Sequence, residues 1–160
     1  MLSSLQYKRF IGVDMLFFVF ACSTALKSQE DPASLYYEKF SDYQTWEQAE
    51  DWIGVQPSQS VHGTFVQIWW NNSAKEAILD GTDIPAGAAL MKEGYNDEEG
   101  NEFIALTLMV KQDGFAPDNN NWFWASYDAA GNVNQSGVVE MCISCHATSD
   151  SDYVLFVEEE

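Results

Sequence analysis

The chain has 160 residues and a mass of 18.0 kDa, a size that fits one domain of ordinary dimensions. A hydrophobic fraction of 46% with only 20% charged residues predicts a packed core and excludes intrinsic disorder. Seven basic residues face 25 acidic ones, so the formal net charge is −18. Because such a surface repels phosphate backbones and anionic headgroups, nucleic acid is excluded as an expected partner, and a charged partner should be cationic.

The N-terminus has the pattern of an export signal. Lys8 and Arg9 precede an apolar run, residues 10–21, that is too short to span a bilayer. Cleavage after the small residues 23–25 would remove residues 1–25, and Cys22 offers a second interpretation, in which a lipoprotein signal ends in an acylated cysteine. We therefore predict a periplasmic protein whose single domain covers residues 26–160, with a lipid anchor at Cys22 as the alternative.

The remaining chain predicts an α+β fold. Apolar residues at three- and four-residue spacings indicate one or two helices between Ser34 and Ile53, and Asn72-Ser73 with Glu76 resembles a capping box that opens a short helix through Leu79. Runs rich in β-branched and aromatic residues predict strands. These runs are Val61–Trp70, Ala88–Tyr95, Phe103–Lys111 and Trp122–Tyr127. Because short polar loops join them, we expect a mainly antiparallel sheet, with a helical segment before it and a short helical turn after it.

The strongest chemical signal is the segment Cys142-Ile143-Ser144-Cys145-His146 in this C-terminal turn. Its spacing is that of covalent c-type haem attachment, in which two thiols bond to the porphyrin and the following histidine binds the iron. A structural disulfide, a thioredoxin-like redox pair and half of a zinc site are the alternatives. Zinc would need further ligands, and the chain offers only His62 and Cys22. We therefore predict one covalent haem c, held by Cys142, Cys145 and His146.

The function of such a haem depends on its sixth coordination position. The sequence contains four candidates for a second strong ligand: His62, Met91, Met109 and Met141. Met141 adjoins the attachment site, and Met91 and Met109 have the alternation of packed strand residues. His62 stands at a strand start, where a hydrogen-bonded structural histidine is the more ordinary role. We therefore expect an iron whose sixth position is open or bound by water.

From Trp46 to Phe156 the chain resembles the cytochrome P-460 family, which includes the cytochromes c′-beta. Beside the haem motif, the resemblance depends on short features in a fixed order. These are His62-Gly63, Asn71 to Ala74, Pro85-Ala86-Gly87, Lys92-Glu93, Met109-Val110-Lys111, Trp122-Phe123-Trp124, and Asp152-Tyr153-Val154 with Phe156.

The resemblance implies an antiparallel β fold, a homodimer and one five-coordinate haem on His146. In the P-460 branch a lysine is bonded to the porphyrin edge, and by position that lysine would be Lys92. That branch oxidises hydroxylamine and, with nitric oxide, forms nitrous oxide; an electron-acceptor cytochrome is the candidate redox partner. The c′-beta branch lacks the bond and binds nitric oxide or carbon monoxide in an apolar pocket. A six-coordinate electron-transfer cytochrome is the third hypothesis. Without the resemblance, Lys92 would be read as a solvated lysine on a half-exposed strand.

Overall fold

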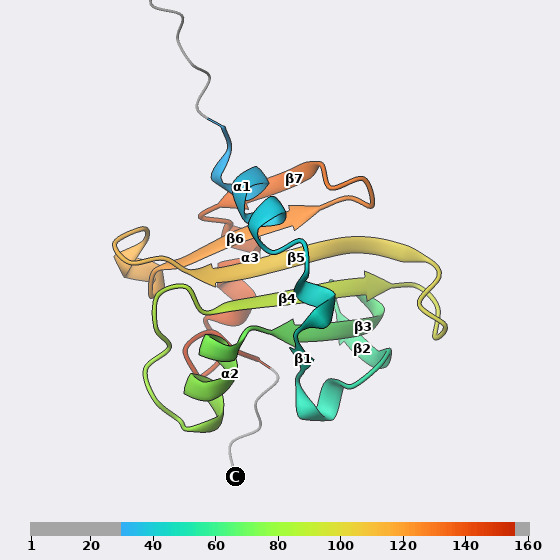
Figure 1. Cartoon of the computed structure of the whole chain (residues 1–160), viewed down its shortest axis with the longest axis horizontal. Helices are drawn as coiled ribbons and strands as arrows, with labels where there is room; N and C mark the ends of the chain where they lie inside the picture. The colour runs from blue at the N-terminus through green and yellow to red at the C-terminus, as the bar shows by residue number, and fades with distance from the viewer. Residues whose placement is uncertain (1–29, 156–160) are drawn as a thin grey trace, which may run out of the picture.

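The computed structural model describes residues 30–155 (Figure 1). The predicted export segment, residues 1–25 with Cys22, lies outside the described residues. Within residues 30–155, no helix is long and apolar enough to cross a bilayer. The strands are β1 (Glu47–Gln48), β2 (Gln56–Ser60), β3 (Gly63–Trp70), β4 (Ala89–Tyr95), β5 (Phe103–Lys111), β6 (Trp122–Tyr127) and β7 (Val133–Gly137). The helices are α1 (Pro32–Lys39), α2 (Asn72–Leu79) and α3 (Glu140–His146), with 3₁₀ turns at Tyr43–Thr45, Glu50–Trp52 and Pro117–Asn119.

The seven strands form one antiparallel sheet in the order β1-β3-β4-β5-β6-β7, and β2 also pairs with β3. From β3 to β7 each strand pairs with the next one along the chain, so these strands form a meander, in which α2 lies in the connection between β3 and β4. Their register places Ile68 opposite Lys92, and Lys92 opposite Thr107. Residues directly opposite each other project to the same face, so these three side chains form a row across the centre of the sheet.

Each face of the sheet carries its own apolar cluster, because successive side chains of a strand alternate between faces. On the face that we call the α3 face, Trp70, Leu90, Met109 and Trp124 pack with Ile143 of α3. The opposite face, the α1 face, is covered by α1 and by the aromatic segment that follows it. Figure 1 shows the two coverings, with α1 in front of the sheet and α3 behind it.

The four predicted strands are confirmed to within two residues at their starts. The predicted helix from Ser34 to Ile53 is wrong over most of its length, because α1 ends at Lys39. Beyond it the chain forms 3₁₀ turns and the two-residue strand β1, whose aromatic neighbours reach the α1 face from turns rather than from a helix. The cap of α2 also lies earlier than the predicted Asn72-Ser73 pair: the Asn71 side chain accepts a hydrogen bond from the Ala74 amide.

Glu93 anchors the aromatic segment to the α1 face. Its carboxylate is buried and accepts hydrogen bonds from the hydroxyls of Tyr43 and Tyr95 and from the Gln44 amide, the last at 2.8 Å. Burial, followed by the hydrogen bond to Glu93, raises the pKa of both tyrosines, so their hydroxyls remain donors at neutral pH. Since Glu93 lies on the α1 face, its neighbour Lys92 projects to the α3 face.

Gly94 permits a close contact between β4 and the turn that carries His62. A Cβ atom at Gly94 would lie 1.7 Å from the carbonyl oxygen of His62, which is backbone and cannot rotate away. The adjacent Gly63 has a φ of 151° and a similar close approach to the backbone of Tyr95. The absence of side chains at these two positions therefore determines where His62 lies.

We predict that Gly94→Ala lowers the free energy of unfolding of the holoprotein by about 3 kcal/mol, because the new methyl group forces the turn away from the sheet. Urea denaturation measures the loss. The control is Gly81→Ala, where the Cβ would meet open space at a φ of 62° and only the backbone conformation is penalised, by about 1 kcal/mol. Equal losses in the two variants would contradict the close contact.

Candidate functional site

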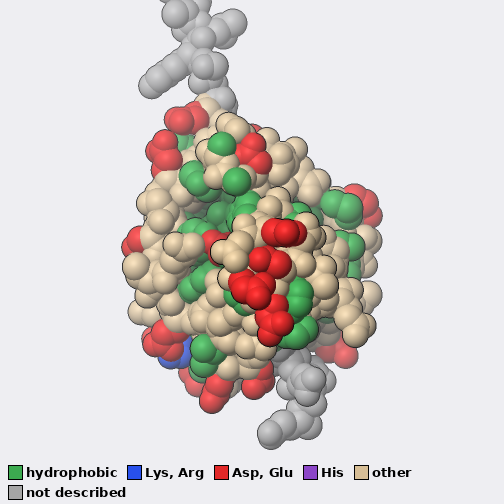
Figure 2. Space-filling model, turned by 90° about the vertical axis from the view of Figure 1, so that its right-hand side faces the viewer, with side chains coloured by type: hydrophobic (Ala, Val, Ile, Leu, Met, Phe, Trp, Pro, Cys, Tyr) green, Lys and Arg blue, Asp and Glu red, His purple; other side chains and the backbone are tan. Residues whose placement is uncertain are grey.

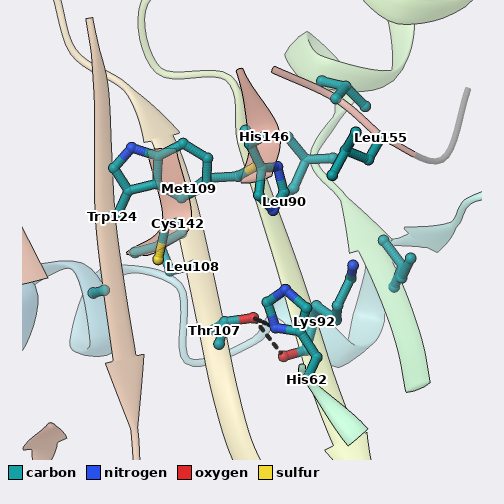
Figure 3. Close-up of a pocket in the computed structure, with 13 residues that line it drawn as sticks. His62, Leu90, Lys92, Thr107, Leu108, Met109, Trp124, Cys142, His146 and Leu155 are labelled. Atoms are coloured by element: carbon teal, nitrogen blue, oxygen red, sulfur yellow. Dashed lines mark hydrogen bonds between the residues drawn. The ribbon is translucent and has the colours of Figure 1, made fainter. Parts of the chain in front are cut away.

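All the predicted site residues except Cys145 meet in one pocket on the α3 face, although they come from distant parts of the chain. Cys142 and His146 are on α3, Lys92 is on β4, and His62 is in the turn before β3 (Figure 3). The pocket contains about 500 Å³ of empty space, its opening to solvent included. Its other walls are mostly apolar. They are formed by Ile68, Leu90, Leu108, Met109, Trp124, Ala125, Val154 and Leu155, with Thr107 as the further polar residue.

His146 is held by a hydrogen bond on one side of its ring and faces the pocket with the other. Its Nδ1 atom lies 2.7 Å from the backbone oxygen of Tyr153. Because a carbonyl oxygen can only accept, Nδ1 carries the proton, and Nε2 keeps its lone pair. Burial lowers the pKa of His146, which also favours the neutral ring. The Trp124 ring packs against the imidazole with centroids 4.8 Å apart. His146 is thus prepared to act as a metal ligand.

The two cysteines flank one turn of α3 and are not joined to each other. Cys142 is half-buried and lines the pocket, whereas Cys145 is exposed. Burial raises the pKa of the Cys142 thiol, so it is protonated at neutral pH. Two separate thiols on the same helix, one lining the pocket and one exposed, can attach to two points of a single group placed beside the helix.

Lys92 differs from the other lysines of residues 30–155 in its surroundings. Lys75 and Lys111 form ion pairs with Glu47 and Asp152, and Lys39 lies over aromatic rings. Within residues 30–155, the Lys92 ammonium has no hydrogen bond or ion pair, although its side chain lies between the apolar walls of the pocket. Burial lowers its pKa to about 8, against an ordinary value of 10.5. The interpretation of Lys92 as a solvated surface lysine is therefore wrong.

His62 is the second histidine of the pocket. Its Nδ1 atom lies 3.3 Å from the Thr107 hydroxyl, which also donates to the Lys92 carbonyl at 3.2 Å. Burial, assisted by the charges of Lys92 and His146, lowers the pKa of His62 to about 3, so the ring is neutral. The rings of His62 and His146 are 6.2 Å apart, and Figure 3 shows His62, Lys92 and Thr107 together, across the pocket from His146.

The three methionine candidates for a second iron ligand lie in different parts of the structure. Met91 is fully buried on the α1 face and is therefore separated from His146 by the sheet. Met141 is on α3 with 61% of its surface exposed. Met109 is on the α3 face and lines the pocket wall. Of the three, only Met109 shares the pocket with His146.

Sequence reasoning missed Thr107 and the contact between Trp124 and His146. Thr107 could have been found from the strand alternation, because it is opposite Lys92 once β4 and β5 are paired in this register. The Trp124 contact had no such signal. It depends on how α3 packs over β6, which brings together residues more than 20 positions apart in the chain.

These residues fit a haem group. The site combines a neutral imidazole with a free Nε2, two unjoined thiols on the same helix, and a largely apolar cavity beside them. The indole Nε1 of Trp124 is buried and has no hydrogen-bond partner among residues 30–155, a donor that an acidic substituent of a bound group could satisfy. The described residues contain no group of three or more His, Cys, Asp or Glu side chains arranged to bind a bare metal ion.

Comparison with known families gives a match to Cytochrome P460 over residues 40–157. Comparison with curated proteins found no match. The matched range contains β1 to β7, α2 and α3, and therefore every residue of the pocket. The chain thus belongs to the cytochrome P460 family, whose name implies a haem cofactor and iron.

Proposed function

We propose that this protein is an exported cytochrome with one covalent haem c that oxidises hydroxylamine and, with nitric oxide, forms nitrous oxide. The observation that carries the proposal is the placement of Lys92 and His62 in one pocket with His146 and Cys142. Haem, when bound, supplies an iron that binds hydroxylamine and accepts its electrons. The overall reaction, NH₂OH + NO → N₂O + H₂O + H⁺ + e⁻, balances when a base takes the proton and an electron-acceptor cytochrome takes the electron.

His146 provides the iron ligand, and Cys142 and Cys145 provide the thioethers. The Nδ1–H bond to the Tyr153 carbonyl keeps Nε2 directed into the pocket and increases its basicity. The apolar walls around it exclude water, which strengthens the interactions of the few polar groups left inside.

The role of Lys92 is to bond to the porphyrin edge. An amine reacts only in its neutral form, and with a pKa near 8 about one Lys92 side chain in ten is neutral at pH 7, far more than for a solvated lysine. The new N–C bond replaces one N–H and one C–H bond and releases two protons and two electrons. A two-electron oxidant of the peroxide class must therefore accept these electrons during maturation.

His62 and Thr107 supply hydrogen-bonding groups for the substrate. His62 is neutral, so its ring offers a lone pair as a hydrogen-bond acceptor, and its hydrogen bond to Thr107 fixes the orientation of the imidazole. The Thr107 hydroxyl also donates a hydrogen bond to the backbone carbonyl of Lys92, so Lys92 is next to this pair. Hydroxylamine in the pocket would meet these groups on the side opposite His146 (Figure 3).

The second candidate function is reversible binding of nitric oxide or carbon monoxide without catalysis. The apolar lining of the pocket favours it, because apolar walls admit uncharged diatomic molecules readily. In that case Lys92 stays unbonded. The third candidate, a six-coordinate electron carrier, requires His62 or Met109 as a second ligand, since Met91 is on the other face of the sheet.

The acidic surface supports a cationic electron acceptor. The loop from Asn96 to Glu102 joins β4 to β5 and carries four acidic residues. It lies at the end of the sheet that faces the viewer in Figure 2, where acidic side chains gather. A basic cytochrome would be attracted to such a surface at low salt. We also propose that the protein is exported to the periplasm and forms a homodimer.

The proposal predicts that Cys142 and Cys145 hold the haem covalently. Acid–acetone extraction of purified holoprotein should leave the pigment on the polypeptide, because thioethers survive denaturation whereas an iron–histidine bond does not. Double substitution of both cysteines by alanine should release it. Extraction of the haem from the unaltered protein would contradict covalent attachment.

The proposal also predicts that Lys92 is bonded to the haem. After proteolysis of holoprotein, mass spectrometry should find the Lys92 peptide joined through haem to the Cys142–His146 peptide. Lys92→Met should abolish this species and hydroxylamine turnover together, while nitric oxide binding persists. The matched control, Lys75→Met, removes a lysine that only forms a surface ion pair and should change neither property. A free Lys92 peptide in holoprotein without hydroxylamine turnover would favour the ligand-binding function.

A further inference from the structure

A polar cluster behind His146 has no part in the proposed reaction. Lys111 ends β5 and Trp122 begins β6, and the two are cross-strand neighbours in the sheet. Both reach Asp152, which follows α3 in the chain. The side chains of Lys111 and Asp152 are only 11% and 27% exposed, so this ion pair is substantially shielded from solvent.

Every polar atom of the Asp152 side chain is bound. Lys111 Nζ donates to Oδ2 at 2.5 Å, and Oδ1 accepts from Trp122 Nε1 at 3.1 Å and from Asn120 Nδ2 at 3.0 Å. Trp122 Nε1 also lies 3.0 Å from the Asp152 backbone oxygen, so the indole contacts both the side chain and the main chain. Lys111 Nζ is 4.7 Å from the centre of the Trp122 ring. The cluster therefore fixes the position of the Asp152 backbone relative to the sheet.

The backbone at this point has an uncommon conformation. Asp152 and Tyr153 have φ values of 47° and 68°, so two successive residues other than glycine are left-handed. Such a conformation persists only where the surrounding structure holds it. The Tyr153 carbonyl then lies 2.7 Å from His146 Nδ1. A relaxed backbone at Asp152 would move this carbonyl.

We propose that Lys111, Asp152 and Trp122 are positioning residues that set the hydrogen bond between the Tyr153 carbonyl and His146 and thereby tune the iron. The proposal rests on the proposed function, because it takes His146 as the iron ligand. A well-placed carbonyl draws the Nδ1 proton and increases the electron donation of Nε2. A displaced carbonyl weakens this donation, which weakens the iron–histidine bond and favours ferrous iron over ferric.

The test uses the iron–histidine stretching band of the reduced holoprotein in resonance Raman spectra, together with the reduction potential. Asp152→Asn removes the charge but keeps a side chain that tolerates left-handed backbone. It should shift the band to lower frequency and the potential to a more positive value. Trp122→Phe, which removes only the indole donor, should shift both in the same direction. Lys111→Arg preserves the ion pair and should leave both values close to those of the unaltered protein.

Lys75→Met is the matched control, because it breaks an ion pair with Glu47 that is remote from His146 in the contacts described. It should leave both readouts unchanged. Folded, haem-loaded Asp152→Asn and Trp122→Phe proteins with unaltered band and potential would overturn the inference and leave the proposed function standing. An unaltered protein that shows no iron–histidine band in its reduced state would contradict the proposed function, and this inference with it.

Discussion

The buried carboxylate of Glu93 is the constraint on which the site depends. Two tyrosine hydroxyls and the Gln44 amide hold it on the α1 face, and strand alternation then directs Lys92 and Leu90 to the α3 face. A slip of one residue in β4 would reverse both faces, which would bury Lys92 among aromatic rings and leave the tyrosines without their acceptor. The register of one central strand therefore determines that a lysine meets the histidine of a distant helix.

The pocket is selective for uncharged molecules because it holds few charged groups. Its walls are mostly apolar, its two histidines are neutral, and its lysine has a depressed pKa. A small uncharged molecule can enter such a space without loss of strong hydration, whereas an anion or a large metabolite cannot. The strong negative charge of the chain lies outside the pocket, where it repels anions. The pocket and the outer surface thus both disfavour anionic ligands.

Much of this arrangement could be predicted from local sequence. The four long strands have clear β-branched and aromatic patterns, and Cys142, Cys145 and His146 are recognisable from their spacing. Strands β2 and β7 were missed because their sequences, QPSQS and VNQSG, are polar and pair only at the margins of the sheet. The aromatic residues after α1 are spaced as in a helix, but they lie in or beside 3₁₀ turns and pack on the α1 face. The pairing of Thr107 with His62, and of Asp152 with Lys111 and Trp122, depends on tertiary contacts over 30 or more residues, which no local pattern reports.

The central claim is that the iron bound by His146 keeps an open position on the side where Lys92, His62 and Thr107 lie. The absorption spectrum of the reduced protein, recorded with and without nitric oxide or carbon monoxide, tests it most directly. We predict a high-spin spectrum that changes at once when either gas is added. A low-spin spectrum that is indifferent to both gases, and that becomes high-spin in His62→Ala or Met109→Ala, would contradict the claim and assign the protein to electron transfer.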